Sequence, residues 1–451
     1  MRCLPKIIFI YLILVFITVP VTAQTTPPIT AIKAGRLIDP ETATVTTNQI
    51  ILVEGERIKA VGANIAIPSG ATIIDLSKLT VLPGLVDTHT HMALTYKEQP
   101  ENNYYYLTFV TDSTALRAIQ AASNGIQLLN SGFTVIRDVG NNAMYADTAL
   151  RQAIEQGWLP GPTVIPSGPI IGSTGGQFWP TPEMYKEHKL MFPEYIDADT
   201  PGEIVKAIRQ NMLLGARTIK LCIDCKPWGY SVDDIKLAIT EAAKGGCKVE
   251  GHVQTPDGAQ RAIDAGIYII AHGNALTPEH HRQMAEKGIF RAGTDTPFTK
   301  YRGSEAAFRQ TVAKLRDAWE KKVPLTFSTD FDYWNERMKS ETGEWLTRGE
   351  MTIAFLDTWT AANIPPADIL RAITINGYKA ADVIKERGPI KTGLFADLIA
   401  VSGDPLTDIN ALRDVQFVMK NGMVFKKDGV MTPEKFFHPG PVRTPNGRWT
   451  R

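Results

Sequence analysis

The chain has 451 residues, of which 44% are hydrophobic and 21% charged, a composition typical of globular proteins. Its 48 Lys and Arg residues nearly balance its 47 Asp and Glu residues, and no basic tract is present, so no nucleic-acid partner is indicated. The length suits one large α/β barrel with an appended domain, or two or three average domains.

The first residues have the three parts of a secretory signal. Arg2 and Lys6 form a positively charged start, an apolar run follows over residues 7–19, and Val-Thr-Ala precedes Gln24. This pattern predicts a signal peptide over residues 1–23, cleaved after Ala23. An uncleaved anchor is the alternative, but the apolar run is short for a membrane-spanning helix. We therefore expect an exported protein, periplasmic or secreted, with no stable membrane anchor.

The cysteines are too few for a disulfide framework. Loss of Cys3 with the signal leaves Cys222, Cys225 and Cys247. Cys222 and Cys225 are spaced Cys-x-x-Cys and could oxidise in an exported protein. No second pair is present to make a zinc ribbon, so we expect an ordinary pair of thiols near the end of a strand.

Both ends of the mature chain have the pattern of β-hairpins. Short β-rich pieces occupy residues 31–82, with Gly, Pro and Asn between them, and the same texture returns over residues 393–429. The simplest topology joins them in one small β-sandwich. The predicted domains are a signal peptide (1–23), the first part of the sandwich (24–84), a central barrel (85–382), and the second part of the sandwich with a C-terminal tail (383–451).

Between these ends, apolar β runs alternate with helical segments, the pattern of a (β/α)8 TIM barrel. The fold class is thus α/β. Two further helices are expected at 348–362 and 366–382. The expected strands are 85–91, 133–138, 163–168, 218–223, 248–253, 267–273, 288–293 and 324–330.

Metal-binding side chains recur within these strands or at their ends. Because strand residues two apart point to the same face, the two histidines of the first strand would project side by side. Imidazole nitrogens bind divalent metals, and barrel active sites gather at the C-terminal ends of strands. The pattern therefore indicates a metal site. Its candidate residues are His89, His91, Lys220, His252, His272 and Asp330.

The other four histidines are expected on the solvated surface. His188 falls in a charged loop and His438 in the tail, whereas His280 and His281 are adjacent on a predicted helix. Adjacent helical residues diverge by about 100°, which makes them poor ligands for one ion.

Several motifs resemble those of the metal-dependent amidohydrolase superfamily, in the branch of imidazolonepropionase-like and prolidase-like enzymes. They occur in the order of that family and extend from about residue 33 to 426. The matching stretches are PGLVDTHTHM, GFTVIRDVG, GARTIKL, GHVQTPDGAQRAIDAGIYIIAHGN, FSTD, AITINGYKAADVI and GLFADLIAVSGDP.

The resemblance implies a site for two divalent metal ions, with zinc as the expected metal. The histidine pair of the first strand would hold the more buried ion, and His252 and His272 the more exposed one. Asp330 would complete the first site and act as the catalytic proton shuttle. Lys220 would be carboxylated by carbon dioxide, and its carbamate would bridge both ions.

The chain also departs from the family pattern. Gln177 of GGQ stands where many relatives have the histidine of GGH, and CIDCKPWGY replaces a glycine-rich stretch after the strand-four lysine. GLFADL also differs from the family's usual GK-ADL. Asp295 of GTD imitates the strand-eight motif, but it directly follows the helix at 277–287 and so belongs to strand seven. Asp330 is therefore the preferred aspartate.

The implied reaction is cleavage of an amide bond by hydroxide formed at the metals. Aromatic residues after strands three, four and eight predict a pocket for an apolar or aromatic group. We expect a dipeptide (Xaa-Pro-like) or an N-acyl amino acid as the small-molecule substrate. A cyclic amide or lactone is the alternative, and a non-catalytic ligand-binding barrel is the alternative of another class. Homo-oligomerisation stays open.

The substrate-binding candidates are Arg137, Gln177, Trp179, Trp228, Tyr230 and Tyr333, with Lys226 as a further partner for a carboxylate.

Overall fold

The computed structural model describes residues 28–97, 108–109, 111–186, 194–297, 304–334, 338–340 and 342–432. The predicted signal peptide, His188 and most of the C-terminal tail, including His438, lie outside the described residues. Within the described ranges, no helix has both the length and the apolarity needed to cross a membrane.

The central part is an α/β fold of parallel strands. Each of the eight predicted segments contains a strand, and consecutive strands pair in parallel in two sheets, β5-β7-β8 and β9-β11-β12-β13-β14-β15, with β10 beside β9. The eight are β5 (Leu85–Thr90), β7 (Phe133–Asp138), β8 (Thr163–Pro166), β11 (Thr218–Cys222), β12 (Lys248–Val253), β13 (Ile269–His272), β14 (Phe290–Ala292) and β15 (Leu325–Thr326). Two short strands, β9 (Ile170–Gly172) and β10 (Tyr195–Asp197), follow β8.

Backbone hydrogen bonds link the two parallel sheets. The amide of Arg217 donates to the carbonyl of Pro166 at 2.7 Å, and the amide of Thr88 donates to that of Phe327 at 3.0 Å. Every residue of β5, β7 and β11 is buried. This is expected for parallel strands covered on both faces, and it explains their nearly continuous apolar sequences.

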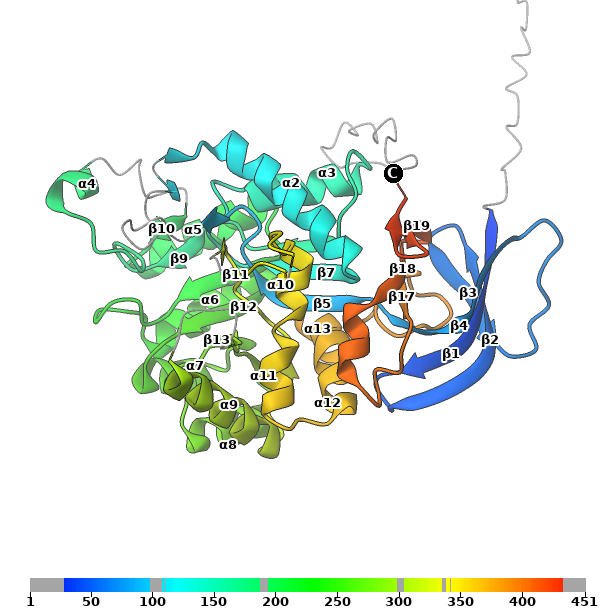
Figure 1. Cartoon of the computed structure of the whole chain (residues 1–451). Coiled ribbons are helices and arrows are strands. Elements are labelled where there is room, and N and C mark those ends of the chain that lie inside the picture. Colours follow the sequence, from blue (N-terminus) through cyan, green and yellow to red (C-terminus); the bar gives the residue numbers. More distant parts are fainter. Residues whose placement is uncertain are drawn as a thin grey trace, which may run out of the picture.

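Helices lie around the outside of these strands (Figure 1). Most begin at a Ser or Thr whose side chain accepts a hydrogen bond from the first turn, as Thr200 does in the capping box of α5. The main ones are α2 (Thr114–Asn130), α3 (Ala146–Glu155), α5 (Pro201–Leu213), α6 (Val232–Lys244), α7 (Pro256–Ala265), α8 (Pro278–Lys287) and α9 (Glu305–Glu320). A short helix, α4 (Pro182–Lys186), lies at the outer edge of the central part, at the left of Figure 1.

The two helices expected near the end of the central part are divided. The first consists of α10 (Arg348–Ile353) and α11 (Leu356–Ala361). The second consists of α12 (Pro366–Arg371), a π-helical turn over Ala372–Asn376 and α13 (Gly377–Ala380). A π turn has almost no local sequence signature, so the pattern predicted one continuous helix.

Strands from both ends of the chain share one sheet, which we call the end sheet. Among the described residues its order is β20-β19-β18-β17-β4-β1-β2-β3, with β17 pairing antiparallel to β4. In Figure 1 the blue and the orange-to-red strands lie side by side at the right. A two-layer sandwich stays a prediction. The strands are β1 (Ile29–Asp39), β2 (Thr44–Glu54), β3 (Arg57–Gly62), β4 (Thr72–Pro83), β17 (Leu398–Val401), β18 (Val415–Lys420), β19 (Met423–Lys427) and β20 (Val430–Met431).

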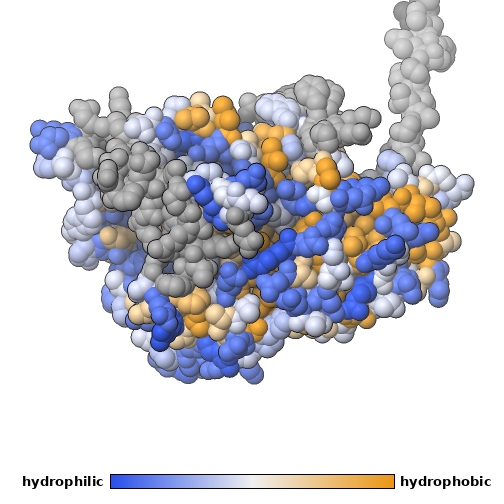
Figure 2. Space-filling view, viewed as in Figure 1, coloured by the Kyte–Doolittle hydropathy of each residue, from blue (hydrophilic) through white to orange (hydrophobic). Residues whose placement is uncertain are grey.

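Hydrophobic packing holds each part together. One large buried cluster joins the central strands to their helices, and a separate cluster including Ile51, Val81 and Phe417 fills the end sheet. On the face drawn in Figure 2, a broad apolar area lies at the right, where Figure 1 places the end sheet, and hydrophilic residues cover much of the lower edge.

Two expectations about individual side chains were wrong. Cys222 and Cys225 are joined in a disulfide, with their Cα atoms 5.6 Å apart, rather than being free thiols. His280 and His281 are buried instead of solvated: Nδ1 of His280 accepts from the amide of Thr277, and Nδ1 of His281 lies 2.5 Å from Asp317. Helix capping accounts for His280, and a hydrogen bond to Asp317 of a neighbouring helix accounts for His281. Neither is visible in the local sequence.

Gly35 tests the packing of the end sheet. It lies where the register of β1 against β4 shifts, and a Cβ there would meet the backbone oxygen of Ser77 at 1.9 Å. We expect Gly35→Ala to lower the free energy of unfolding by about 1–3 kcal/mol, because the backbone must move to relieve the overlap. Thermal unfolding followed by circular dichroism measures the effect. Gly202→Ala, where a Cβ meets nothing within 4 Å, is the control and should not destabilise the protein. Equal midpoints for the two variants would contradict this account.

Candidate active site

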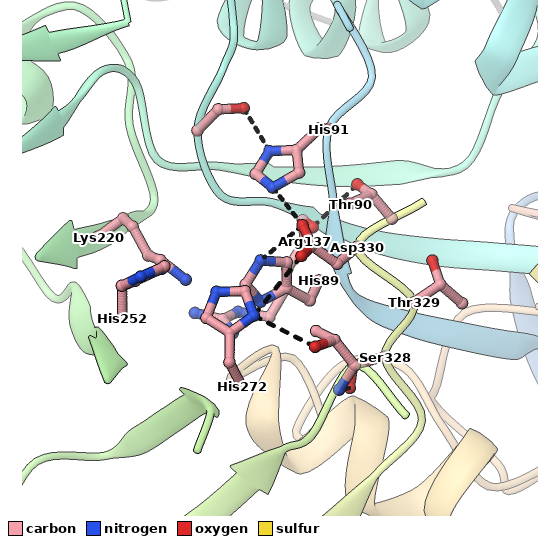
Figure 3. A network of polar contacts seen from close by, with 12 residues as sticks. His89, Thr90, His91, Arg137, Lys220, His252, His272, Ser328, Thr329 and Asp330 are labelled. Carbon is pink, nitrogen blue, oxygen red and sulfur yellow. Dashed lines mark hydrogen bonds and ion pairs between the residues drawn. The ribbon is translucent and has the colours of Figure 1, made fainter. Parts of the chain in front are cut away.

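The six predicted metal-site residues lie in or after five different strands and meet at one end of the central part. His89 and His91 come from the end of β5, Lys220 from β11, His252 from β12 and His272 from β13, whereas Asp330 follows β15. Figure 3 shows His89, His91 and His272 gathered around Asp330, with Lys220 and His252 beside them. The parallel arrangement is what brings residues so distant in sequence to one place.

Asp330 is the centre of the group. Its Oδ1 lies 2.7 Å from Nε2 of His91 and 3.5 Å from Nε2 of His89, and its Oδ2 lies 3.5 Å from Nδ1 of His272. The ring centroids of His252 and His272 are 4.4 Å apart. One carboxylate and several imidazoles therefore converge on a small volume.

Two of these residues have a left-handed backbone. His272 has φ of 62° and Asp330 has φ of 55°, in the region that residues other than glycine seldom adopt. Such conformations cost on the order of 1–3 kcal/mol and persist where the surrounding structure enforces them. For Asp330 that enforcement is visible, because its amide donates to the carbonyl of His89 at 2.9 Å.

Buried acceptors fix the orientation of both first-strand histidines. Nδ1 of His91 lies 2.7 Å from the carbonyl oxygen of Gly140, and Nδ1 of His89 lies 2.9 Å from Oε1 of Glu250. In each ring the remaining nitrogen, Nε2, faces Asp330. A hydrogen-bond acceptor at the ring nitrogen that does not bind the metal, here Nδ1, is the usual support of a metal-binding histidine. It selects the tautomer and the ring orientation.

Lys220 is also held by Glu250. Its Nζ lies 2.7 Å from Oε1 of Glu250, and the other oxygen of that carboxylate pairs with the guanidinium of Arg137. All three side chains are almost completely buried. One carboxylate thus serves two cations and a histidine, and the sequence alone did not identify it.

The electrostatics keep most of the imidazoles neutral. Burial, reinforced by the charge of Lys220, lowers the pKa of His89 to about 4 and that of His252 to about 3. Burial and neighbouring His252 lower the pKa of His272 as well. Burial also lowers the pKa of the Lys220 amine. Burial opposes the charge on His91, but its hydrogen bond to Asp330 and the charge of that carboxylate raise the pKa of His91.

The donor set fits a divalent metal ion. His89, His272 and Asp330 each offer a ligand atom, and these atoms lie within 4.8 Å of one another. Nε2 of the buried His89 forms no hydrogen bond with any residue that the structure describes, whereas its Nδ1 contacts Glu250. Neutral imidazoles with a carboxylate suit zinc and similar first-row metals. The same atoms could instead relay protons, but a buried, unsatisfied imidazole is better explained as a ligand.

A cavity of about 420 Å³ opens above these residues. Its lining is mostly polar and includes both acids and bases. Around the histidines it is formed by residues such as Asn141, Gln177, Gln254, Asn274, Arg291, Asp295 and Lys314. Asp295 binds Arg291 through two contacts of 2.8 Å, so this aspartate is engaged in an ion pair and not with the histidines.

Comparison with known proteins places this architecture in a family. The model of the amidohydrolase family matches residues 80–425, which is most of the chain. The chain belongs to the amidohydrolase family. It is accordingly a hydrolase of the superfamily that acts on carbon–nitrogen bonds.

Individual relatives span nearly the whole amidohydrolase. An ochratoxinase from Aspergillus niger is 26% identical over 452 residues, covering 89% of this chain and 88% of that protein. An imidazolonepropionase from Alkaliphilus metalliredigens is 24% identical over 415 residues, covering 84% and 90%. Among solved structures, a Xaa-Pro dipeptidase with bound methionine superposes with a TM-score of 0.73 at 25% identity, covering 88% of this chain and all of that one.

The predicted substrate residues are dispersed in the amidohydrolase. Of those whose side chains are described, Gln177 lines the cavity. Arg137 is buried against Glu250, and Tyr230 is buried with its hydroxyl donating to the carbonyl of Ala198. Trp179 and Trp228 form an exposed edge-to-face pair that does not line the cavity.

The expectation of an aromatic pocket is therefore not met by the described side chains. Tyr333 lies in β16 (Tyr333–Trp334), which pairs with β6 (Tyr96–Lys97), but its side chain is outside the described part. Lys226 is buried, with its ammonium donating to the carbonyl of Phe178 and lying over the ring of Trp179. Loop aromatics here pack on the protein itself, which composition cannot distinguish from contact with a ligand.

Glu250 provides a test of the buried charge cluster. We expect Glu250→Gln to lower the free energy of unfolding by about 3–5 kcal/mol, because Arg137 and Lys220 lose their shared buried anion. Metal affinity, measured by zinc titration, should fall by about 10–100-fold as His89 loses its support. Glu279→Gln, which removes half of an exposed ion pair with Arg282, is the control and should change neither quantity. Wild-type stability in the Glu250 variant would contradict the assignment.

Proposed function

We propose that this amidohydrolase cleaves the amide bond of a dipeptide or an N-acyl amino acid with the help of two divalent metal ions, most suitably zinc. The convergence of three histidines on Asp330, beside Lys220 and His252, carries this proposal. When bound, the metal ions polarise the amide carbonyl and lower the pKa of water. The names of the relatives, an ochratoxinase and a Xaa-Pro dipeptidase, support the choice of substrate class.

The protein's own residues would then perform distinct tasks. His89 and His91 would hold one ion and His252 and His272 the other. Asp330 would accept the proton of the attacking water and deliver it to the leaving nitrogen, since amines leave poorly unless they are protonated. Its position within 3.5 Å of three imidazoles suits a group that reaches both the ligands and the substrate.

Lys220 would carry a carbamate formed by carbon dioxide, which would serve as a further ligand for the metal ions. Burial lowers the pKa of its amine, and a neutral amine is the form that attacks carbon dioxide. Attack forms the nitrogen–carbon bond and releases one proton. Glu250, 2.7 Å from Nζ, would then hold the remaining N–H and so orient the carbamate.

The finer points of architecture and location belong to the same proposal. We propose that the two parallel sheets form a single (β/α)8 barrel, a view that the hydrogen bonds between them support. We also propose that residues 1–23 direct export. The Cys222–Cys225 disulfide agrees with that, because disulfides persist mainly in oxidising compartments.

Metal analysis combined with a hydrolysis screen tests the proposal. The purified mature protein should contain about two zinc ions and cleave aromatic or prolyl dipeptides or N-acyl amino acids. Asp330→Asn should keep its metal and lose about 10²–10⁴-fold in kcat, because the proton shuttle is gone. Asp264→Asn, on the exposed face of α7, should match the wild type in both respects. Full activity of the Asp330 variant would refute its role.

The same screen separates the alternatives. Two metals without cleavage of any linear amide would redirect the search to cyclic amides and lactones. No metal after reconstitution with zinc and bicarbonate would favour a barrel that binds a ligand without turning it over.

Lys314 is the best placed partner for a substrate carboxylate. It lines the cavity from α9, and its ammonium donates to the carbonyl of Asn274, whose side chain contacts Gln254 beside His252. This assignment replaces Arg137, whose guanidinium is engaged with Glu250.

Kinetics of Lys314→Met test that assignment. For substrates with a free carboxylate we expect KM to rise by about 10–100-fold with little change in kcat, because a charged hydrogen bond is lost equally in the bound substrate and the transition state. The C-terminal amides of the same substrates should be unaffected. Lys321→Met, just after α9 and paired with Asp317, is the matched control. An equal rise in KM for acids and amides would exclude a specific contact with the carboxylate.

A further inference from the structure

A second cavity, of about 490 Å³, lies between the central part and the end sheet; we call it the junction cavity. Its walls come from the C-terminal end of α3 and the segment after it, the start of β8, and β18 and β19 with their connecting turn. None of the residues that line it also lines the cavity at the histidines. Because β8 begins here and the active site gathers at the other ends of the strands, the two cavities are at opposite ends of the parallel strands.

Lys420 supplies an unpaired charge to the junction cavity. It ends β18 and is 5% exposed. Its ammonium forms no hydrogen bond or ion pair with any residue in the described part of the chain. The neighbouring carboxylate of Asp397 is already engaged, because one oxygen pairs with Arg387 at 2.5 Å and the other accepts from the amide of Asn421 at 2.8 Å.

None of the other charged residues around the junction cavity forms an ion pair with Lys420, although the carboxylates of Glu56 and Glu155, which also line it, favour its charge from a distance. Arg151 pairs with Glu155 at 2.8 Å, and Arg387 also donates to the side chain of Asn421. Burial, with the charge of Arg387, lowers the pKa of Lys420 to about 8, so at neutral pH it is still mainly protonated. A buried ammonium without a partner is unfavourable, and natural proteins seldom keep one without a counter-ion.

Much of the remaining wall of the junction cavity is apolar, formed by Ile154, Leu159, Val164, Met423 and Phe425. Glu56, Gln156 and Thr163 add polar groups to it. A volume of this size is in the range of sites that enclose small ligands, which are typically apolar with a few placed polar groups. One free cation beside an apolar wall matches a molecule with one negative charge and an apolar body.

We propose that the junction cavity is a second binding site, separate from the active site, for a small amphipathic carboxylate. The carboxylate pairs with Lys420, and the apolar body packs between the segment after α3 and β19. A monoanion fits better than a phosphate dianion, because Arg151 and Arg387 are already neutralised by Glu155 and Asp397. The site does not depend on the proposed catalytic function.

Calorimetric titration of the metal-loaded protein with 4-phenylbutyrate tests the proposal, with 4-phenylbutyramide as the uncharged equivalent. We expect the acid to bind at least about tenfold more tightly than the amide, as a charge-assisted contact would require. Lys420→Met should lose about tenfold in affinity for the acid, and Lys420→Arg should retain most of it. Lys206→Met, on the exposed face of α5, should bind as the wild type does. Unchanged affinity in a folded Lys420→Met variant would overturn the proposal. Binding of the probe at the metal site instead would give that same result.

Chemical labelling gives a second test that needs no variant. An amine-directed acylating reagent at pH 8, followed by peptide mass spectrometry, measures how fast Lys420 reacts. We expect 4-phenylbutyrate to slow acylation of Lys420 several-fold while leaving Lys206 unaffected, and the amide to have a much smaller effect. Equal labelling of Lys420 with and without the acid would overturn the proposal.

Discussion

The carboxylate of Glu250 is the interaction on which the active site depends. In a buried site it contacts the ammonium of Lys220, the guanidinium of Arg137 and Nδ1 of His89. Without this carboxylate, the ammonium of Lys220 and the guanidinium of Arg137 would lie in a buried region, beside several imidazoles, with no counter-ion. The charges of Lys220 and Arg137 outweigh the effect of burial and hold the pKa of Glu250 well below its ordinary value. The carboxylate is therefore favoured in its charged form, and it contacts side chains from three other strands, β5, β7 and β11.

A second buried carboxylate positions the other side of the site. Asp87 accepts hydrogen bonds from the hydroxyl of Thr329 at 2.6 Å and from the amide of His89 at 3.1 Å. It therefore ties the segment that carries Asp330 to the strand that carries the histidines. Burial raises the pKa of Asp87 to about 7. Together with the hydrogen bond from the amide of Asp330 to His89, this link explains how Asp330 keeps its left-handed backbone.

The two cavities of this amidohydrolase illustrate opposite arrangements of charge. Around the histidines, acids and bases are interleaved: Arg291 pairs with Asp295, and Lys314 lines the cavity with its ammonium bonded to the carbonyl of Asn274. At the junction of the end sheet, Arg151 pairs with Glu155 and Arg387 pairs with Asp397, whereas Lys420 has no ion pair with a described residue and shares the cavity with several apolar side chains. The first arrangement suits a polar substrate that reacts. The second suits a molecule that is held by one charge and its apolar surface.

The sequence predicted the positions of the central strands better than the helices around them. Alternation of apolar β runs with helices located all eight central strands, because a strand buried on both faces must be continuously apolar. The ends of those strands suggested the four histidines and Asp330 as candidate ligands, since catalytic residues of such folds lie there. Lys220, in the middle of its strand, was given its role by the resemblance to the family. Helical periodicity has no signal for a π turn, so the segment at 366–382 was predicted as one helix and is divided at Ala372–Asn376.

What the sequence could not decide depended on contacts between distant segments. Glu250 looked like an ordinary polar residue two places before His252, and its role became visible when β5, β7 and β11 came together around it. Arg137 and Tyr230 seemed available to a substrate until the fold buried them, and His281 seemed exposed until α9 brought Asp317 to it. Local pattern fixes which residues enter a strand and which face they share. Only the tertiary structure decides which charges are paired, because pairing depends on side chains that lie far apart in the chain.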